Sequence, residues 1–280
     1  MSEESVTVPG EDPPYTPEFD ISRPTIARVY DAILGGKDNF AADREGAAAY
    51  MKFVPNSREV AIDNRAGLEK GVAYMARKGI DQFLDVGAGL PTMRNTHQVA
   101  QEINPDAKVV YVDNDPIVLA HGRALLETND STTIVTADLR DPESILDHPD
   151  VKKVIDFSRP VGLMVVGLFM HFHDDERPGD WVQELVDACP SGSYLLMTDF
   201  ADTGEPQQKA IEKAGLESLG NGWVRKPEKI EEHFCGLPLV EPGLEWVPRW
   251  FPGEPDKEVP AAEDLEPYNR IMMAGLGYKE

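Results

Sequence analysis

From residue 81 onward, short apolar runs alternate with longer segments in which apolar residues recur every three or four positions. The first pattern is typical of buried strands and the second of amphipathic helices. Strands are predicted at 82–86, 109–112, 132–136, 161–169, 193–198 and 269–274. Helices are predicted between them, at about 92–103, from Pro116 to about Glu127, from Asp141, and at 181–188 and 205–218. Such alternation predicts an α/β fold, with a mostly parallel sheet covered by helices.

The first eighty residues follow a different pattern. Residues 1–20 are rich in proline and acids and contain few large apolar groups, which predicts a mobile tail. Helical spacing then predicts helices at 26–34 and 41–51, and a longer helix from Asn56 or Ser57 to about Arg77. We therefore expect a helical lid at 21–80, followed by an α/β domain at 81–280.

Composition restricts the possible partners. The chain of 280 residues is 41% apolar and carries a net charge of −23, with 50 acidic against 27 basic residues. This acidity disfavours binding to nucleic-acid phosphates or anionic lipid and is compatible with a small or cationic substrate. Cys189 and Cys235 lack metal-ligand spacing. The longest apolar run, Val161–Met170, is too short for a membrane span, and no signal peptide is recognisable, so we expect a soluble cytoplasmic protein.

The first predicted strand of the α/β region leads into a glycine turn, Asp85-Val86-Gly87-Ala88-Gly89. A strand, a Gly-x-Gly turn and a helix together are typical of a nucleotide-binding site. The dinucleotide fingerprint requires a third glycine where this chain has Thr92, and Asp85 would repel a pyrophosphate. An acid at this position suits a ligand with positive groups, such as the amino group and sulfonium of S-adenosylmethionine. An NAD-dependent oxidoreductase is therefore the less favoured alternative.

Further candidate ligand contacts follow the other strands, because ligands of parallel α/β sheets bind beyond the carboxyl ends of the strands. Asp113 is the preferred acceptor for the ribose hydroxyls, with Asp115 as a close alternative and Asn114 between them. Asp138 is expected to accept the adenine amino group, with the backbone amide of Leu139 beside it. At the end of the fourth strand, we expect four further residues to pass the sulfur side of the ligand, namely Leu168, Phe169, Met170 and His171.

Three segments resemble an actinobacterial S-adenosylmethionine-dependent methyltransferase family that was formerly a domain of unknown function. They are Arg23–Asp43, with its Tyr-Asp-x-x-Leu-Gly-Gly-Lys-Asp-Asn run, together with Phe83–Thr92 and Val110–Pro116. The resemblance extends from about residue 20 to the C-terminus. It implies a class I methyltransferase fold, a Rossmann-like three-layer sandwich, with S-adenosylmethionine as cofactor, and it implies no substrate. Gly167–Phe172 departs from the Leu-His-His ending that is more usual in the resembled sequences.

The Gly-Gly-Lys-Asp-Asn run suggests a hinged lid over the site. Lys37 is expected to meet the cofactor carboxylate, and Tyr30 and Asn39 to hydrogen-bond its methionine portion. The alternative is that Lys37 and Asn39 only terminate a helix.

His171 is the candidate general base. His173 and the acidic residues after it could also suggest a metal site. Acidic turns are common after strands, however, and we expect no metal. The predicted function is methyl transfer from S-adenosylmethionine to a small molecule. The main alternative is a non-catalytic sensor or partner protein that binds S-adenosylmethionine or S-adenosylhomocysteine.

Overall fold

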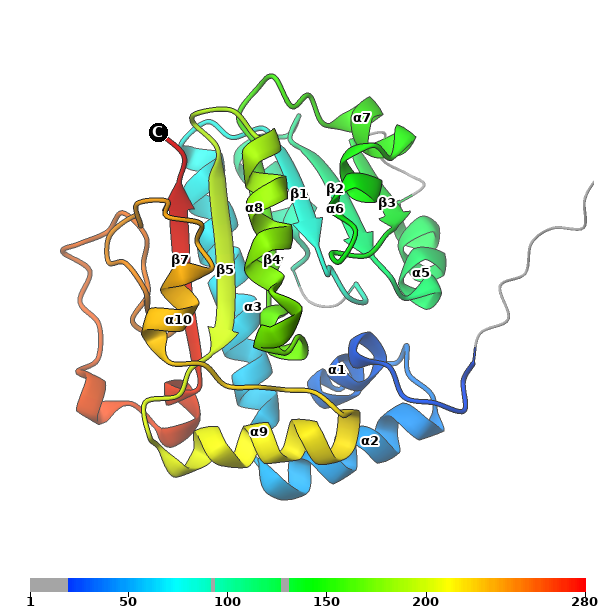
Figure 1. Ribbon diagram of the computed structural model, residues 1–280, viewed down its shortest axis with the longest axis vertical. Coiled ribbons are helices and arrows are strands. Elements are labelled where there is room, and N and C mark those ends of the chain that lie inside the picture. The colour runs from blue at the N-terminus through cyan, green and yellow to red at the C-terminus, as the bar shows by residue number, and fades with distance from the viewer. Residues whose placement is uncertain (1–19, 92–93, 127–130) are drawn as a thin grey trace, which may run out of the picture.

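A computed structural model describes residues 20–91, 94–126 and 131–280 (Figure 1). The predicted tail, apart from Asp20, lies outside the described residues. The described chain contains one seven-stranded sheet with the order β3-β2-β1-β4-β5-β7-β6. Its first five strands are parallel, and β7 runs antiparallel to both of its neighbours, β5 and β6. The strands are β1 Gln82–Val86, β2 Lys108–Asp113, β3 Thr132–Thr136, β4 Gly162–Val166, β5 Tyr194–Phe200, β6 Glu245–Trp246 and β7 Met272–Tyr278.

Helices cover both faces of the sheet, as the alternation predicted. Successive strand residues are buried on opposite faces: Phe83 packs into one apolar cluster and Leu84 into the other. One face is covered by α3 Ser57–Arg77, α4 Thr96–Ile103 and α5 Pro116–Leu126. The other is covered by α6 Pro142–Leu146, α7 Pro149–Val154, α8 Pro178–Ala188 and α10 Pro227–Glu232.

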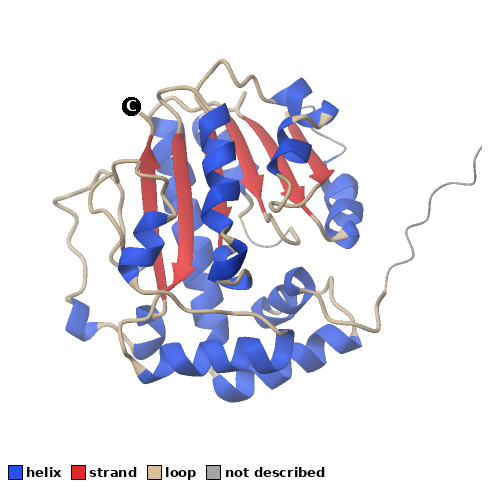
Figure 2. Cartoon of the chain, in the orientation of Figure 1, coloured by secondary structure: helices blue, strands red, loops and turns tan. Residues whose placement is uncertain are grey.

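The lid predicted at 21–80 divides into two parts. The long helix α3 packs against β4, β5 and β7 rather than over the strand ends. Gly71 permits this close approach, because a Cβ there would lie 2.6 Å from the side chain of Leu196 on β5. The remaining helices, α1 Ile26–Leu34 and α2 Ala41–Phe53, join α9 Pro206–Leu219 to form a layer that we call the cap. In Figures 1 and 2 the cap lies across the carboxyl ends of the parallel strands.

Three predicted boundaries differ from the structure. The fourth strand ends at Val166 instead of residue 169, because Gly167 turns the chain with a φ of 65° into a 3₁₀ turn at Phe169–His171. The last strand begins at Met272 rather than residue 269, after another 3₁₀ turn. The helix after the glycine turn begins at Thr96 rather than at 92, and positions 92 and 93 lie outside the described residues.

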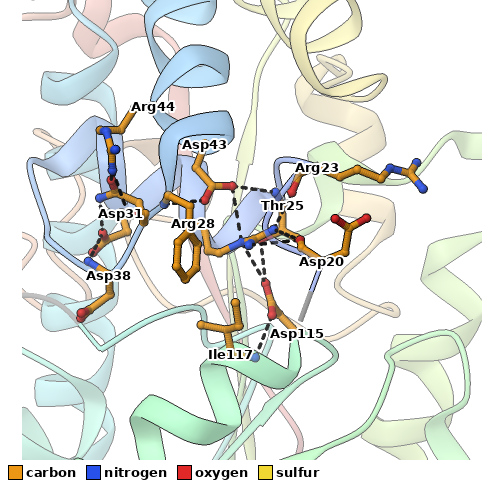
Figure 3. Close-up of polar contacts among 12 residues, drawn as sticks. Asp20, Arg23, Thr25, Arg28, Asp31, Asp38, Asp43, Arg44, Asp115 and Ile117 are labelled. Atoms are coloured by element: carbon orange, nitrogen blue, oxygen red, sulfur yellow. Dashed lines mark hydrogen bonds and ion pairs between the residues drawn. The ribbon is translucent and has the colours of Figure 1, made fainter. Parts of the chain in front are cut away.

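Arg28 is the central residue of a buried polar network that attaches the cap to the sheet (Figure 3). Its side chain is 1% exposed, and its Nε lies 3.4 Å from an oxygen of Asp43 and 3.9 Å from an oxygen of Asp115. The same Nε donates to the hydroxyl of Thr25, which in turn donates to Asp115 at 2.6 Å. Asp115 also accepts the backbone amide of Ile117 at 2.9 Å and so begins helix α5. The network therefore joins α1 and α2 to the end of strand β2.

Replacing Arg28 by methionine should lower the free energy of unfolding by about 3–5 kcal/mol, because the buried carboxylate of Asp43 would lose its cation. Urea unfolding measures this change. Arg44→Met is the matched control, since Arg44 is an exposed cap residue whose side chain donates to Asn39. Its effect should stay within about 0.5 kcal/mol. Equal effects of the two substitutions would contradict the role assigned to Arg28.

Candidate functional site

A cavity of about 830 Å³ lies between the carboxyl ends of the strands and the cap. Its walls come from the ends of β1 to β4, from α1 and α3, and from the loop after α9. Most of the site residues predicted from sequence line it together. They are Tyr30, Asp85, Gly87, Ala88, Gly89, Asp113, Asn114, Asp115, Asp138, Leu139, Leu168 and His171.

The glycine turn is anchored on the neighbouring strand. The amides of Gly87 and Ala88 both donate to the carbonyl oxygen of Val112, at 2.8 and 3.2 Å. Gly87 and Gly89 have φ values of 75° and 65°, which favour glycine. A Cβ at Gly89 would meet no atom within 4 Å, so the backbone there is open to a ligand.

Asp85 lies at the carboxyl end of β1 and is 4% exposed. One of its oxygens accepts the hydroxyl of Thr96 at 2.7 Å. Burial raises the pKa of Asp85 to about 6, although the Thr96 hydrogen bond and the positive charge of Arg65 oppose the increase. A cation arriving in the cavity would favour the ionised carboxylate.

The two candidate ribose acceptors have different surroundings. Asp113 accepts the amide of Gly89 at 2.8 Å and that of Asp115 at 2.9 Å. Burial raises its pKa. Asp115 is bound to Thr25 and to the first turn of α5, so its carboxylate serves the network around Arg28. Both residues line the cavity, and the hydrogen bonds that the Asp113 carboxylate accepts from Gly89 and Asp115 come from backbone amides.

At the end of β3, Asp138 forms hydrogen bonds that its sequence position did not predict. Its carboxylate accepts the side chain of Arg140 at 2.6 Å and the side-chain amide of Asn114 at 2.9 Å. The hydrogen bond from Arg140 lowers the pKa of Asp138 to about 2. Asp138 is therefore ionised over the whole physiological range.

His171 lies on the opposite side of the cavity, in the 3₁₀ turn after β4. Its Nδ1 is 2.7 Å from the Oδ1 of Asn221. Because the Nδ2 of Asn221 donates to the carbonyl of Leu219, its Oδ1 faces the imidazole as an acceptor. His171 therefore carries its proton on Nδ1, and Nε2 is left as an acceptor. Burial lowers the pKa of His171 to about 4, so the ring is neutral at physiological pH.

The turn that carries His171 is fixed by Arg225. The guanidinium of Arg225 donates to the backbone carbonyls of Phe169 and Phe172, on either side of the histidine. It also forms ion pairs with Asp174 and with the fully buried Asp199, at 2.7 and 3.2 Å. Arg225 thus ties the turn that carries His171 to strand β5 through Asp199.

Four predicted ligand contacts are not brought to the cavity. Lys37 is exposed and does not line it. The side-chain amide of Asn39 donates to Asp31 at 2.8 Å and to the carbonyl of Gly36, so it stabilises the loop between α1 and α2. Phe169 and Met170 are buried and do not line the cavity.

Gly35 and Gly36 shape the same loop between α1 and α2. A Cβ at Gly36 would lie 1.9 Å from the carboxylate of Asp31, so glycine is required by this close contact. Gly35 ends α1 in the left-handed conformation. The alternative considered from sequence, that Lys37 and Asn39 only terminate a helix, agrees better with this arrangement.

Several residues that line the cavity were not predicted, among them Asn64, Arg65, Arg140, Asn221 and Trp223. Asn64 donates to the hydroxyl of Tyr30 at 3.2 Å, and that hydroxyl donates to the carbonyl of Ala61 at 3.0 Å. Asn64 was detectable, because it lies midway between Val60 and Leu68 on the apolar side of a predicted helix. Asn221 and Trp223 lie in a loop without a periodic pattern, which sequence reasoning cannot place.

Within residues 20–91, 94–126 and 131–280, no group of three His, Cys, Asp or Glu side chains is arranged to hold a metal ion. No helix in the described part of the chain is both long and apolar enough to cross a membrane.

The strand order, with its antiparallel β7, and the acids at the strand ends define a class I methyltransferase. Residues 13–280 match the model of the S-adenosyl methyltransferase family, and the chain belongs to that family. It is a methyltransferase that depends on S-adenosylmethionine, and this excludes the NAD-dependent alternative.

Two solved structures resemble the whole chain. A candidate methyltransferase from Thermobifida fusca is 50% identical, with a TM-score of 0.87 over 94% of this chain and 98% of that one. A protein of the DUF574 family from Streptomyces avermitilis is 35% identical, with a TM-score of 0.84 over 93% of this chain and 99% of that one. A search of curated proteins finds no match.

The residues present fit S-adenosylmethionine. The open backbone at Gly89 and the acid Asp85 suit the amino acid portion of the cofactor, which carries an ammonium group. Asp113 would hold the ribose, and Asp138 with Leu139 would hold the adenine. The cavity volume also lies within the usual range for cofactor sites, about 300–1,000 Å³.

The affinity for S-adenosylmethionine should decrease as the pH falls through about 6, by up to about tenfold per pH unit. The folded pKa of Asp85 is raised to about 6, so below that pH a proton must leave the carboxylate before the cation binds well. Calorimetric titrations between about pH 4.5 and 7.5 test this, because the α-amino and α-carboxyl groups of the ligand titrate outside most of that range. Asp85→Asn should bind more weakly and show a flatter pH dependence. A wild-type affinity independent of pH would contradict the assignment.

Proposed function

We propose that this methyltransferase acts on a small molecule, whose nucleophilic atom binds next to His171. The observation that carries the proposal is the mixed lining of the cavity. The strand-end acids and the glycine turn line it together with His171, Asn221 and Trp223, which none of the contacts assigned to the cofactor requires. The cap lies across the carboxyl ends of the strands that form this cavity, which favours a small acceptor over a polymer.

Asp85, Asp113 and Asp138 would hold S-adenosylmethionine, which would supply a methyl group on a positively charged sulfur. Transfer would form a bond from the acceptor atom to the methyl carbon and break the bond from that carbon to sulfur, leaving the electron pair on sulfur. The protein orients the acceptor, which can account for roughly 7–11 kcal/mol of the barrier. His171 Nε2 accepts a hydrogen bond from the acceptor O–H or N–H group and receives its proton as the new bond forms. Asn221 keeps the imidazole in the tautomer that makes this possible.

Transfer of labelled methyl groups tests the proposal. The protein is incubated with S-adenosylmethionine labelled on its methyl group and with the low-molecular-weight fraction of a Streptomyces extract. We expect label in a small product. Asp113→Ala should lose ten- to hundredfold in cofactor affinity, because hydrogen bonds to a charged group are worth about 1.5–3 kcal/mol. The exposed Asp106→Ala is the matched control. Cofactor binding without transfer to any fraction would favour a non-catalytic sensor instead.

The state of His171 can be measured without knowing the acceptor. Nuclear magnetic resonance of ¹⁵N-labelled imidazoles should show that the rings of His171 and His233 stay neutral down to about pH 5, because burial lowers the pKa of each to about 4. The ring of His171 should carry its proton on Nδ1. His171→Gln assigns the signal, and Asn221→Ala should weaken the preference for this tautomer. Titration of His171 near its ordinary pKa of about 6.5 would contradict the proposed role.

A further inference from the structure

A smaller cavity of about 70 Å³ lies between the cap and the sheet. Its walls are mostly apolar and come from α1, α3, α9 and the strand ends, for example Val29, Ile33, Val60, Met170 and Ile211. It shares several lining residues with the main cavity, including Tyr30, Asn64, His171 and Asn221. The smaller cavity therefore adjoins the main one at the imidazole.

Ser57 is one of the polar residues in this mostly apolar wall. It is 3% exposed, and among the described residues its hydroxyl has no hydrogen-bond partner. A buried hydroxyl without a partner destabilises the folded protein, because it loses its hydrogen bonds to water. Folding alone does not explain this hydroxyl, since alanine would fill the same position without that cost. A ligand that supplies the missing partner does explain it.

We infer that the smaller cavity binds a substituent of the methyl acceptor and that Ser57 recognises a polar group at its end. This inference rests on the proposed function. The acceptor would be a small hydroxy compound with an apolar body, whose reacting hydroxyl binds His171 Nε2 and whose second hydrogen-bonding group reaches Ser57.

The volume limits the size of this substituent. An apolar cavity of about 150 Å³ accommodates benzene, and a water molecule takes about 30 Å³ in the liquid. A cavity of about 70 Å³ therefore holds two or three heavy atoms and not a ring. Any ring of the acceptor must lie in the main cavity, beside His171, with a short side chain directed under the cap.

Two matched phenols test this geometry with the protein saturated by S-adenosylhomocysteine. They are 4-ethylphenol and 4-(2-hydroxyethyl)phenol, which differ by one terminal hydroxyl. Calorimetry should show that the hydroxyethyl compound binds wild-type protein about three- to tenfold more tightly, the range expected for one hydrogen bond. Ser57→Ala should abolish this preference and leave the affinity for 4-ethylphenol unchanged.

Ser57→Ala should also leave the melting temperature unchanged or raise it, because the substitution removes an unpartnered buried hydroxyl. A merely structural serine would lower it. Ser158→Ala, in an exposed loop on another part of the molecule, is the control and should keep the preference for the hydroxyethyl compound. Ala61→Val adds two methyl groups to a lining residue of the smaller cavity and should weaken both phenols at least fivefold without affecting S-adenosylhomocysteine.

The inference is overturned if S-adenosylhomocysteine binds and neither phenol does, or if the preference persists in Ser57→Ala. It is equally overturned if both phenols bind wild-type protein with the same affinity. In each of these cases the proposed function is unaffected. Failure of wild-type protein to bind S-adenosylhomocysteine would instead remove the proposed function itself.

Discussion

The buried guanidinium of Arg28 is the interaction on which the arrangement of the site depends. It balances two carboxylates, Asp43 from the cap and Asp115 from the end of β2, in a region closed to water. Such a group is stable only while its partners stay in place. The cap is therefore held at a defined distance from the strand ends, and the two cavities between them exist because of that distance.

This constraint explains the residues of the N-terminal segment that resembles the family, Arg23–Asp43, which we call the signature. Thr25, Arg28 and Asp43 form the attachment to the sheet. Asp31 and Asn39 close the loop between α1 and α2, where Gly36 leaves room for the carboxylate of Asp31. The signature therefore sets the position of the cap, while Lys37 and Asn39 lie outside the lining of the main cavity. The cap in turn supplies Ile26 and Tyr30 to both cavities, so the same segment shapes the site that we assign to the acceptor.

The sheet and the ligand-facing strand ends could be predicted because they depend on local patterns. Apolar runs identified β1 to β5, and the ends of parallel strands share one edge, so Asp85, Asp113 and Asp138 could be grouped without coordinates. Lys37 and Asn39 were misplaced because a polar run after a helix does not reveal whether it faces a ligand or its own loop. Ser57, Asn221 and Arg225 were missed because their roles arise from contacts between segments far apart in the chain. The spacing of apolar residues along the sequence does not indicate such contacts.

The charges of the site are consistent with a cationic cofactor and a neutral base. Asp138 is held ionised by Arg140, whereas burial brings the pKa of Asp85 to about 6, so its charge is most stable when a cation is near. A protonated imidazole close to a sulfonium would repel it, and burial prevents this by lowering the pKa of His171 to about 4. The lowered pKa also makes His171 a weaker base in the proposed reaction, because proton transfer is most efficient when the pKa lies near the working pH. Such a base suits an acceptor whose hydroxyl is itself acidic, which is the reason for choosing phenols over aliphatic alcohols as probes.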